Sequence, residues 1–157
     1  MVMTMNIFDR MVFKLVLFWR WLLTEYVTVL GALQPRPLEL LGVLWAVGWG
    51  LWVGNPYWEV FPGSATFRIM AIVAPEWVWG TVMITLGVQH LCALYSKNLT
   101  WRYYSSVVAF LLWSFTAIVL MIGNPSSTAT VTYGMLSSMS GLVMSKLMLQ
   151  LRDRGEE

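Results

Sequence analysis

Residues 76–125 read EWVWGTVMITLGVQHLCALYSKNLTWRYYSSVVAFLLWSFTAIVLMIGNP, two long apolar runs separated by a short polar turn. The runs cover about 76–95 and 103–122. A helix that crosses a bilayer needs about 20 mostly apolar residues. Pro75 precedes the first run and Gly123-Asn124-Pro125 follows the second, which suits proline because it lacks an N–H. The stretch therefore predicts two transmembrane helices.

The same pattern recurs on both sides of this stretch. A run over about 38–54 lies between Pro35-Arg36-Pro37 and Asn55-Pro56, and a more polar run covers about 131–149. Residues 55–75 then form an outer loop. We expect one membrane domain over residues 1–157: an all-α integral membrane protein with four transmembrane helices in two hairpins, preceded by an N-terminal helix.

Composition supports this class. The 157 residues are 58% hydrophobic and 11% charged, against about a quarter charged in ordinary soluble domains. A soluble domain of this size has too much exterior for its volume to cover so much apolar surface. The formal net charge of +2 is too small for a nucleic-acid binder, and a single cysteine, Cys92, excludes an internal disulfide.

The distribution of positive charge predicts the orientation, because cytoplasmic loops collect Lys and Arg. With the N-terminus inside, four spans leave only Arg68 in the outer segment. The other Lys and Arg residues fall inside: Arg10, Lys14, Arg20, Arg36, Lys97, Arg102, Lys146, Arg152 and Arg154. We therefore expect both termini in the cytoplasm, in the inner membrane of a bacterial or phage-infected cell.

Residues 7–33 form a predicted amphipathic helix. At 100° per residue one half of the wheel carries the charges, and the other carries large apolar side chains such as Leu15, Leu22 and Leu30. This pattern is typical of a helix that lies in the membrane interface. The alternative is a fifth span, which would place Arg20 and Glu25 near the bilayer centre at a cost of about 3 kcal/mol each.

The two hairpins carry a weak repeat. Gly54-Asn55-Pro56 ends the first span and Gly123-Asn124-Pro125 ends the third. An aromatic–Gly pair opens each second helix, and another glycine follows seven residues on: Trp79-Gly80 with Gly87, and Tyr133-Gly134 with Gly141. A parallel repeat and chance matching in a glycine-rich chain both remain open.

Small residues line one face of the first span at every fourth position: Gly42, Ala46, Gly50 and Gly54. This spacing lets two helix backbones approach closely in lipid. The face is a predicted helix-packing interface, with another helix of the same chain or with a second copy.

Polar residues follow one face of the second span: Thr81, Thr85, Gln89, Cys92 and Ser96. In lipid such side chains are expected to turn inward and to bond across helices. They are interpreted as polar contacts inside the bundle, with a path for water, ions or a small substrate as the alternative.

His90 is the one ionisable residue well inside a predicted span, apart from Lys146 near a helix end. With no second histidine, a bis-histidine haem within one chain is excluded, and no carboxylate is expected at mid-membrane. We expect a neutral, structural imidazole. The sequence predicts no catalytic residue, no cofactor and no metal site.

The outer loop is aromatic and sparsely charged. Its docking residues, if it binds a partner, are predicted to be Tyr57, Trp58, Phe61, Phe67 and Arg68. The alternative is an interfacial aromatic belt. Ser64 is a predicted cap for a short helix over 65–74.

These features favour a small non-enzymatic membrane protein that associates with another membrane protein or with itself, as an accessory or assembly subunit. The expected partners are the lipid bilayer and a membrane protein, with no nucleic acid. The alternatives are a phage-type membrane-permeabilising or pore-forming protein and a membrane enzyme or redox subunit that uses His90.

Overall fold

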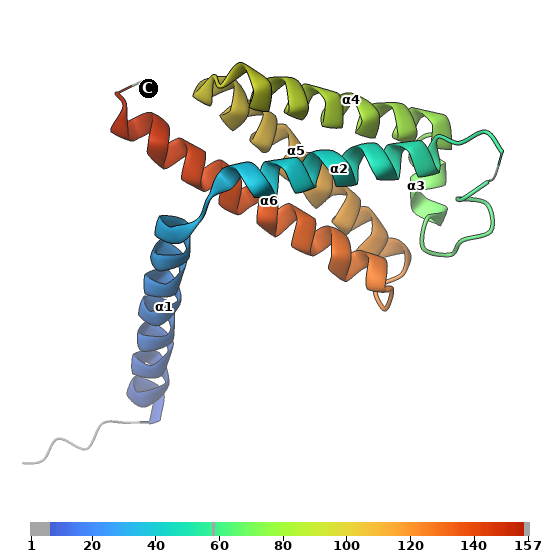
Figure 1. Cartoon of the computed structure of the whole chain (residues 1–157). Helices are drawn as coiled ribbons and strands as arrows, with labels where there is room; N and C mark the ends of the chain where they lie inside the picture. Colours follow the sequence, from blue (N-terminus) through green and yellow to red (C-terminus); the bar gives the residue numbers. More distant parts are fainter. Residues whose placement is uncertain (1–6, 58, 156–157) are drawn as a thin grey trace, which may run out of the picture. The chain divides into compact units, whose positions relative to one another are not determined.

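The computed structural model describes residues 7–57 and 59–155 and divides into two compact units, residues 1–33 and 34–157 (Figure 1). The described residues are all-helical, with no strand, which confirms the predicted all-α class. The helices are α1 (Ile7–Ala32), α2 (Pro35–Val53), α3 (Arg68–Val73), α4 (Glu76–Ser96), α5 (Leu99–Gly123) and α6 (Thr128–Asp153).

The first unit consists of α1 alone in its described part, a single helix of 26 residues. This confirms that the segment predicted over residues 7–33 is helical. In the described part of this unit, α1 has no second helix against which its apolar face could pack. Whether this helix lies in the interface or spans the membrane stays a prediction.

The second unit is a bundle of two helix hairpins. Helix α2 packs against α4, and α5 packs against α6, while contacts of α4 with α5 and of α2 with α6 join the hairpins. The short helix α3 lies against α5. The four long helices lie where the four apolar runs were predicted, within a few residues at each end.

Local sequence sets the helix ends. Proline occupies the first turn of α2, and Gly54 caps its C-terminus. The Asn98 side chain accepts a hydrogen bond from the Trp101 N–H at 3.0 Å, so it starts α5 directly after the turn. Ser127 caps α6 in the same way, accepting from the Ala129 N–H.

Two helices within the described residues, α4 and α5, are long and apolar enough to cross a membrane. Their most apolar stretches have mean hydropathies of 1.3 and 2.2. Helix α2 falls short because it carries Arg36 and Glu39 together with three tryptophans, and α6 because it is rich in Ser and Thr. A membrane location is supported by these two helices.

Glycine backbones bring α2 and α4 into direct contact. A Cβ added at Gly50 would lie 2.8 Å from the Gly80 carbonyl oxygen, and one added at Gly80 would lie 2.5 Å from the Gly54 Cα. Ala46, on the same face, is buried. Gly42 is different, because an added Cβ would meet nothing within 4 Å. The contact therefore involves Gly50 and Gly54, with α4 of the same chain as the partner.

The two hairpins use the first of their matching glycines differently. Gly80 touches the backbone of α2, whereas a Cβ at Gly134 would meet nothing within 4 Å. The second glycine of each motif faces the first helix of its own hairpin: Gly87 faces Val43 and Val47 of α2, and Gly141 faces the Phe110 ring of α5. The repeated motif thus corresponds to a repeated contact at its second glycine only.

The segment between α2 and α4 is held by side chains of α4. The Trp79 Nε1–H donates to the Met70 and Ala74 carbonyl oxygens at 3.1 and 3.2 Å, and the Glu76 carboxylate accepts from the Phe61 N–H. The predicted cap at Ser64 is wrong. Helix α3 begins at Arg68 after Phe67, with no side-chain cap, because the Phe67 N–H already donates to the Ser64 carbonyl oxygen.

Candidate functional site

A buried ion pair joins the two hairpins. Glu39 lies on α2 and Arg102 on the first turns of α5, and both are buried, at 2% and 6% exposure. The Arg102 Nε–H donates to Glu39 Oε1 at 3.0 Å, and Nη2 donates to Oε2. This bidentate geometry is the strong form of an arginine–carboxylate contact. It fixes the first hairpin against the second.

This pair was not predicted from the sequence. Arg102 falls in the predicted inner loop before the third span, and Glu39 lies within the predicted first span without an evident partner. The two residues are 63 positions apart, and nothing in the local pattern connects them. The signal that was available is the position of Glu39 inside an apolar run, because a carboxylate there requires a cationic or hydrogen-bonding partner.

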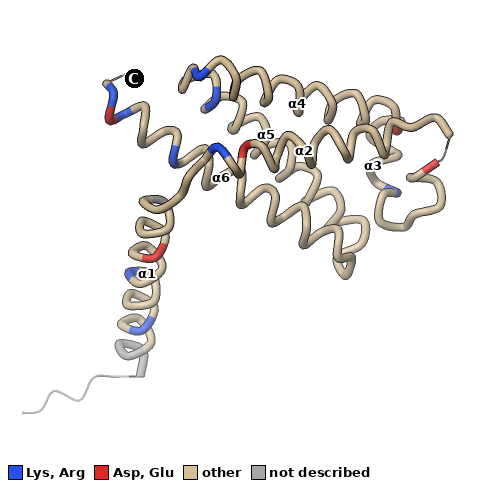
Figure 2. Tube along the Cα trace, in the orientation of Figure 1, with Lys and Arg blue, Asp and Glu red and all other residues tan. Residues whose placement is uncertain are grey.

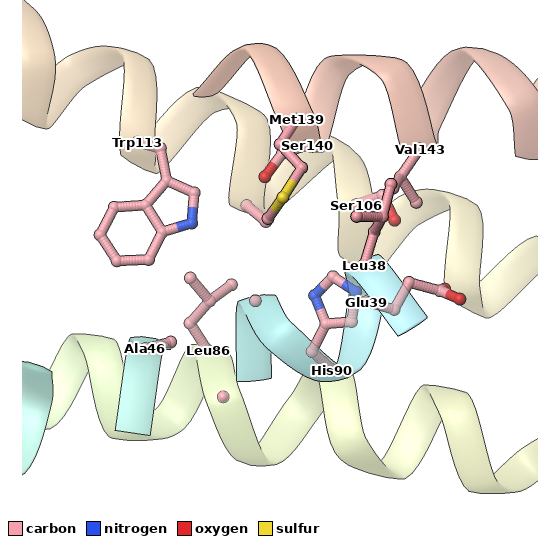
Figure 3. Close-up of a pocket in the computed structure, with 13 residues that line it drawn as sticks. Leu38, Glu39, Ala46, Leu86, His90, Ser106, Trp113, Met139, Ser140 and Val143 are labelled. Atoms are coloured by element: carbon pink, nitrogen blue, oxygen red, sulfur yellow. The ribbon is translucent and has the colours of Figure 1, made fainter. Parts of the chain in front are cut away.

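A small cavity lies beside the ion pair, at the centre of the bundle where all four long helices meet (Figure 3). The volume open to the centre of a water molecule is about 10 Å³. This is room for about one water molecule. Its walls combine Glu39 of α2, His90 of α4, Ser106 and Trp113 of α5, and Ser140 of α6.

His90 and Ser106 supply unsatisfied polar atoms to this cavity. Both side chains are buried, and neither His90 Nε2 nor Ser106 Oγ has a hydrogen-bond partner. The buried Ser105 Oγ of the same helix also lacks one. His90 is therefore placed beside the ion pair, in the bundle interior. In the part of the chain that the structure describes, no three Asp, Glu, His or Cys residues group as metal ligands.

Two buried serines of the bundle, one with a hydrogen bond to another helix and one without, provide a matched test of what such a bond contributes to stability. Ser137 Oγ lies 2.6 Å from Ser114 Oγ, a hydrogen bond between α6 and α5, whereas Ser106 Oγ has no such partner. We expect Ser137→Ala to lower the free energy of unfolding in detergent by about 1 kcal/mol. Ser106→Ala should change it by less than about 0.5 kcal/mol, since no protein group loses a bond. An equal or larger loss for Ser106→Ala would contradict this assignment.

The predicted polar stripe of α4 faces outward. Thr81, Thr85, Cys92 and Ser96 are exposed and Gln89 is half-buried. The inward face of α4 is instead made mainly by Trp79, Met83, Leu86, Gly87, His90 and Ala93. The expectation that the stripe bonds inside the bundle is thus wrong, because the larger apolar side chains of α4 occupy the core and turn the stripe away from it.

The predicted docking residues of the outer segment separate into two groups. Tyr57 is 91% exposed and Arg68 is also exposed. Phe61 and Phe67 are buried and stack on each other, with ring centroids 5.3 Å apart, so they pack within the loop rather than projecting from its surface. Trp58 lies outside the described residues.

Comparison of the chain with protein-family models, curated proteins and solved structures finds no match.

Proposed function

We propose that this protein is a non-enzymatic, multi-pass membrane protein that associates with another membrane protein or with a second copy of itself through the outward polar face of α4. This face comprises Thr81, Thr85, Gln89, Cys92 and Ser96. The observation that carries the proposal is that a helix apolar enough to span a membrane turns these polar side chains away from its own bundle.

Lipid offers such side chains no hydrogen bonds, so neighbouring helices supply them. Thr81 is satisfied within its own helix, because its hydroxyl donates to the Trp77 carbonyl oxygen at 2.7 Å. The Gln89 side chain is not satisfied within its own helix. Its amide carries two donor hydrogens and an acceptor oxygen. Among the described residues the structure records no hydrogen bond for that amide. A second helix against α4 would satisfy it.

The proposal includes four spans. Helices α2 and α6 have 19 and 26 residues, enough for about 28 and 39 Å at 1.5 Å per residue. Pairing with Arg102 removes the net charge that otherwise makes Glu39 costly within an apolar layer. Since both helices share a core with α4 and α5, we expect all four to cross together.

Charge supports one orientation of the bundle. Arg68 is the first residue of α3, in the segment that joins the end of α2 to the start of α4. The other Lys and Arg residues of the second unit lie toward the opposite end, where α2 and α5 begin and α4 and α6 end: Arg36, Lys97, Arg102, Lys146, Arg152 and Arg154. Most blue segments of the second unit gather there in Figure 2. The positive-inside rule would place this end in the cytoplasm. The C-terminus would then be cytoplasmic, and α1 is proposed to lie on the same face.

The single cysteine gives a direct test, because Cys92 is exposed on the outward face of α4. A benzophenone maleimide attached to Cys92 and photolysed in native membranes should give one defined cross-linked product. A dimer that also forms in vesicles of pure protein would identify a second copy, and a larger product confined to native membranes would identify another protein.

The control moves the probe to α5. In a Cys92→Ser background, Leu111→Cys places it on an exposed apolar position, and the product should be absent. Gln89→Leu should lower the yield at Cys92 about threefold for each hydrogen bond lost. Equal cross-linking from both positions, or none from Cys92, would refute association through this face.

A further inference from the structure

A groove opens on the outside of the bundle where α2 begins and α4 ends. Its volume is about 530 Å³. The walls are mostly apolar, formed by Pro37, Leu40, Leu91, Leu94 and Tyr95. Two cationic side chains, Arg36 and Lys97, complete the lining. The groove is separate from the central cavity and from the outward polar face of α4.

We propose that this groove binds one anionic phospholipid, with the phosphate between Arg36 and Lys97 and an acyl chain along Leu40, Leu91 and Leu94. The antiparallel packing of α2 and α4 creates the site, because it brings the first turn of one helix beside the last turn of the other. Residues 61 positions apart in sequence thereby supply the two positive charges.

Charge complementarity selects an anionic occupant. No carboxylate lines the groove, and the nearest one in sequence, Glu39, is bonded to Arg102 inside the bundle. Among the described residues no ion pair is recorded for Arg36 or Lys97. The N-terminus of α2 adds a partial positive charge at the same end. A phosphate placed there gains two cations without displacing an existing partner.

The shape selects a lipid over a soluble anion. Three leucines and a proline form the wall, which free phosphate would leave exposed to water. An acyl chain would cover it. Lys97 directly follows the last residue of α4, one of the two helices apolar enough to span. Cations at that position lie at the level of lipid headgroups. Basic grooves between spanning helices bind anionic headgroups in this way.

The inference rests on α4 crossing a membrane, but not on the association proposed for its polar face. The two are distinguishable because they use different residues. The groove variants leave Thr81, Thr85, Gln89 and Cys92 unchanged, so cross-linking at Cys92 should persist when lipid binding is lost. Gln89→Leu should leave lipid binding intact.

The test uses the full chain in a neutral detergent, titrated with phosphatidylglycerol or phosphatidylcholine and followed by native mass spectrometry. Phosphatidylglycerol should form a one-to-one adduct at concentrations at which phosphatidylcholine forms none. Arg36→Gln with Lys97→Gln should weaken this binding on the order of tenfold or more. Both side chains are exposed, so the variant should keep its fold, as its melting temperature without lipid would verify.

The matched control is Arg152→Gln with Arg154→Gln, which removes the same charge from exposed positions outside the groove. It should bind phosphatidylglycerol as the wild type does. Equal weakening in this control would show general attraction to anionic surfaces and overturn the site. Equal binding of phosphatidylcholine, or displacement of the lipid by millimolar inorganic phosphate, would overturn it as well.

Discussion

Arg102→Met is expected to destabilise the bundle more than any other single substitution considered for this chain. It removes the cation but leaves the Glu39 carboxylate buried, with no partner of opposite charge. Breaking a buried ion pair in this way costs about 3–5 kcal/mol. The loss should appear as a lower midpoint of unfolding when the protein in mild detergent is titrated with a denaturing one.

A double variant distinguishes the effect of the unpaired charge on stability from the effect of changed packing. Glu39→Met with Arg102→Met replaces both side chains by apolar groups of similar length, and should recover most of the stability lost by either single change. Arg154→Met, at an exposed position, should be close to neutral. If the double variant were as unstable as the sum of the two singles, the ion pair would not be what couples these positions.

Gly80→Ala is expected to have the next largest effect, by forcing α2 and α4 apart. The new methyl group would lie 2.5 Å from the Gly54 Cα and 2.9 Å from the Gly50 carbonyl oxygen. Backbone atoms cannot rotate out of the way as side chains do. The two helices must separate, and overpacking of this kind costs about 1–3 kcal/mol. The same unfolding titration measures it.

Gly48→Ala is the matched control for this contact. Gly48 lies on α2, but an added Cβ would meet nothing within 4 Å. Alanine also favours helix over glycine by about 1 kcal/mol, so this variant should be neutral or more stable. A Gly80→Ala protein as stable as Gly48→Ala would show that the helices do not approach as closely as the structure has them.

Helix positions were predictable because they depend on local sequence. Apolar runs of sufficient length predict the four long helices of the second unit, and the prolines at 35 and 75 and the glycines at 54 and 123 mark several of their ends. Packing of Gly50 and Gly54 was also anticipated, because small residues at a spacing of four mark a close helix contact whatever the partner is.

The direction in which α4 faces was not predictable in the same way. Its inward face mixes tryptophan, methionine, leucine, glycine and histidine, while the opposite face alternates Thr, Gln and Cys with valine. Both faces are suited to contact with another helix. Only the positions of α2 and α5 determine which one becomes the core, and this is a property of three helices together.

The candidate site could not be predicted from local sequence either, because long-range contacts bring its residues together. Residue type identified His90, but its neighbours Glu39 and Ser106 come from two other helices. The outer segment shows the same limit: its aromatic residues were recognised, yet Phe61 is buried where its N–H donates to the Glu76 carboxylate 15 residues away, and Tyr57 is exposed. Composition alone cannot distinguish a docking aromatic from one that holds a loop.

The ion pair has a consequence for biogenesis. Glu39 emerges from the ribosome 63 residues before Arg102. At about 5–20 residues per second this separates their synthesis by about 3–13 seconds. Throughout this delay the nascent first hairpin holds an acidic group whose counter-ion does not yet exist. We therefore expect translation speed between these two codons to influence how much of the protein matures.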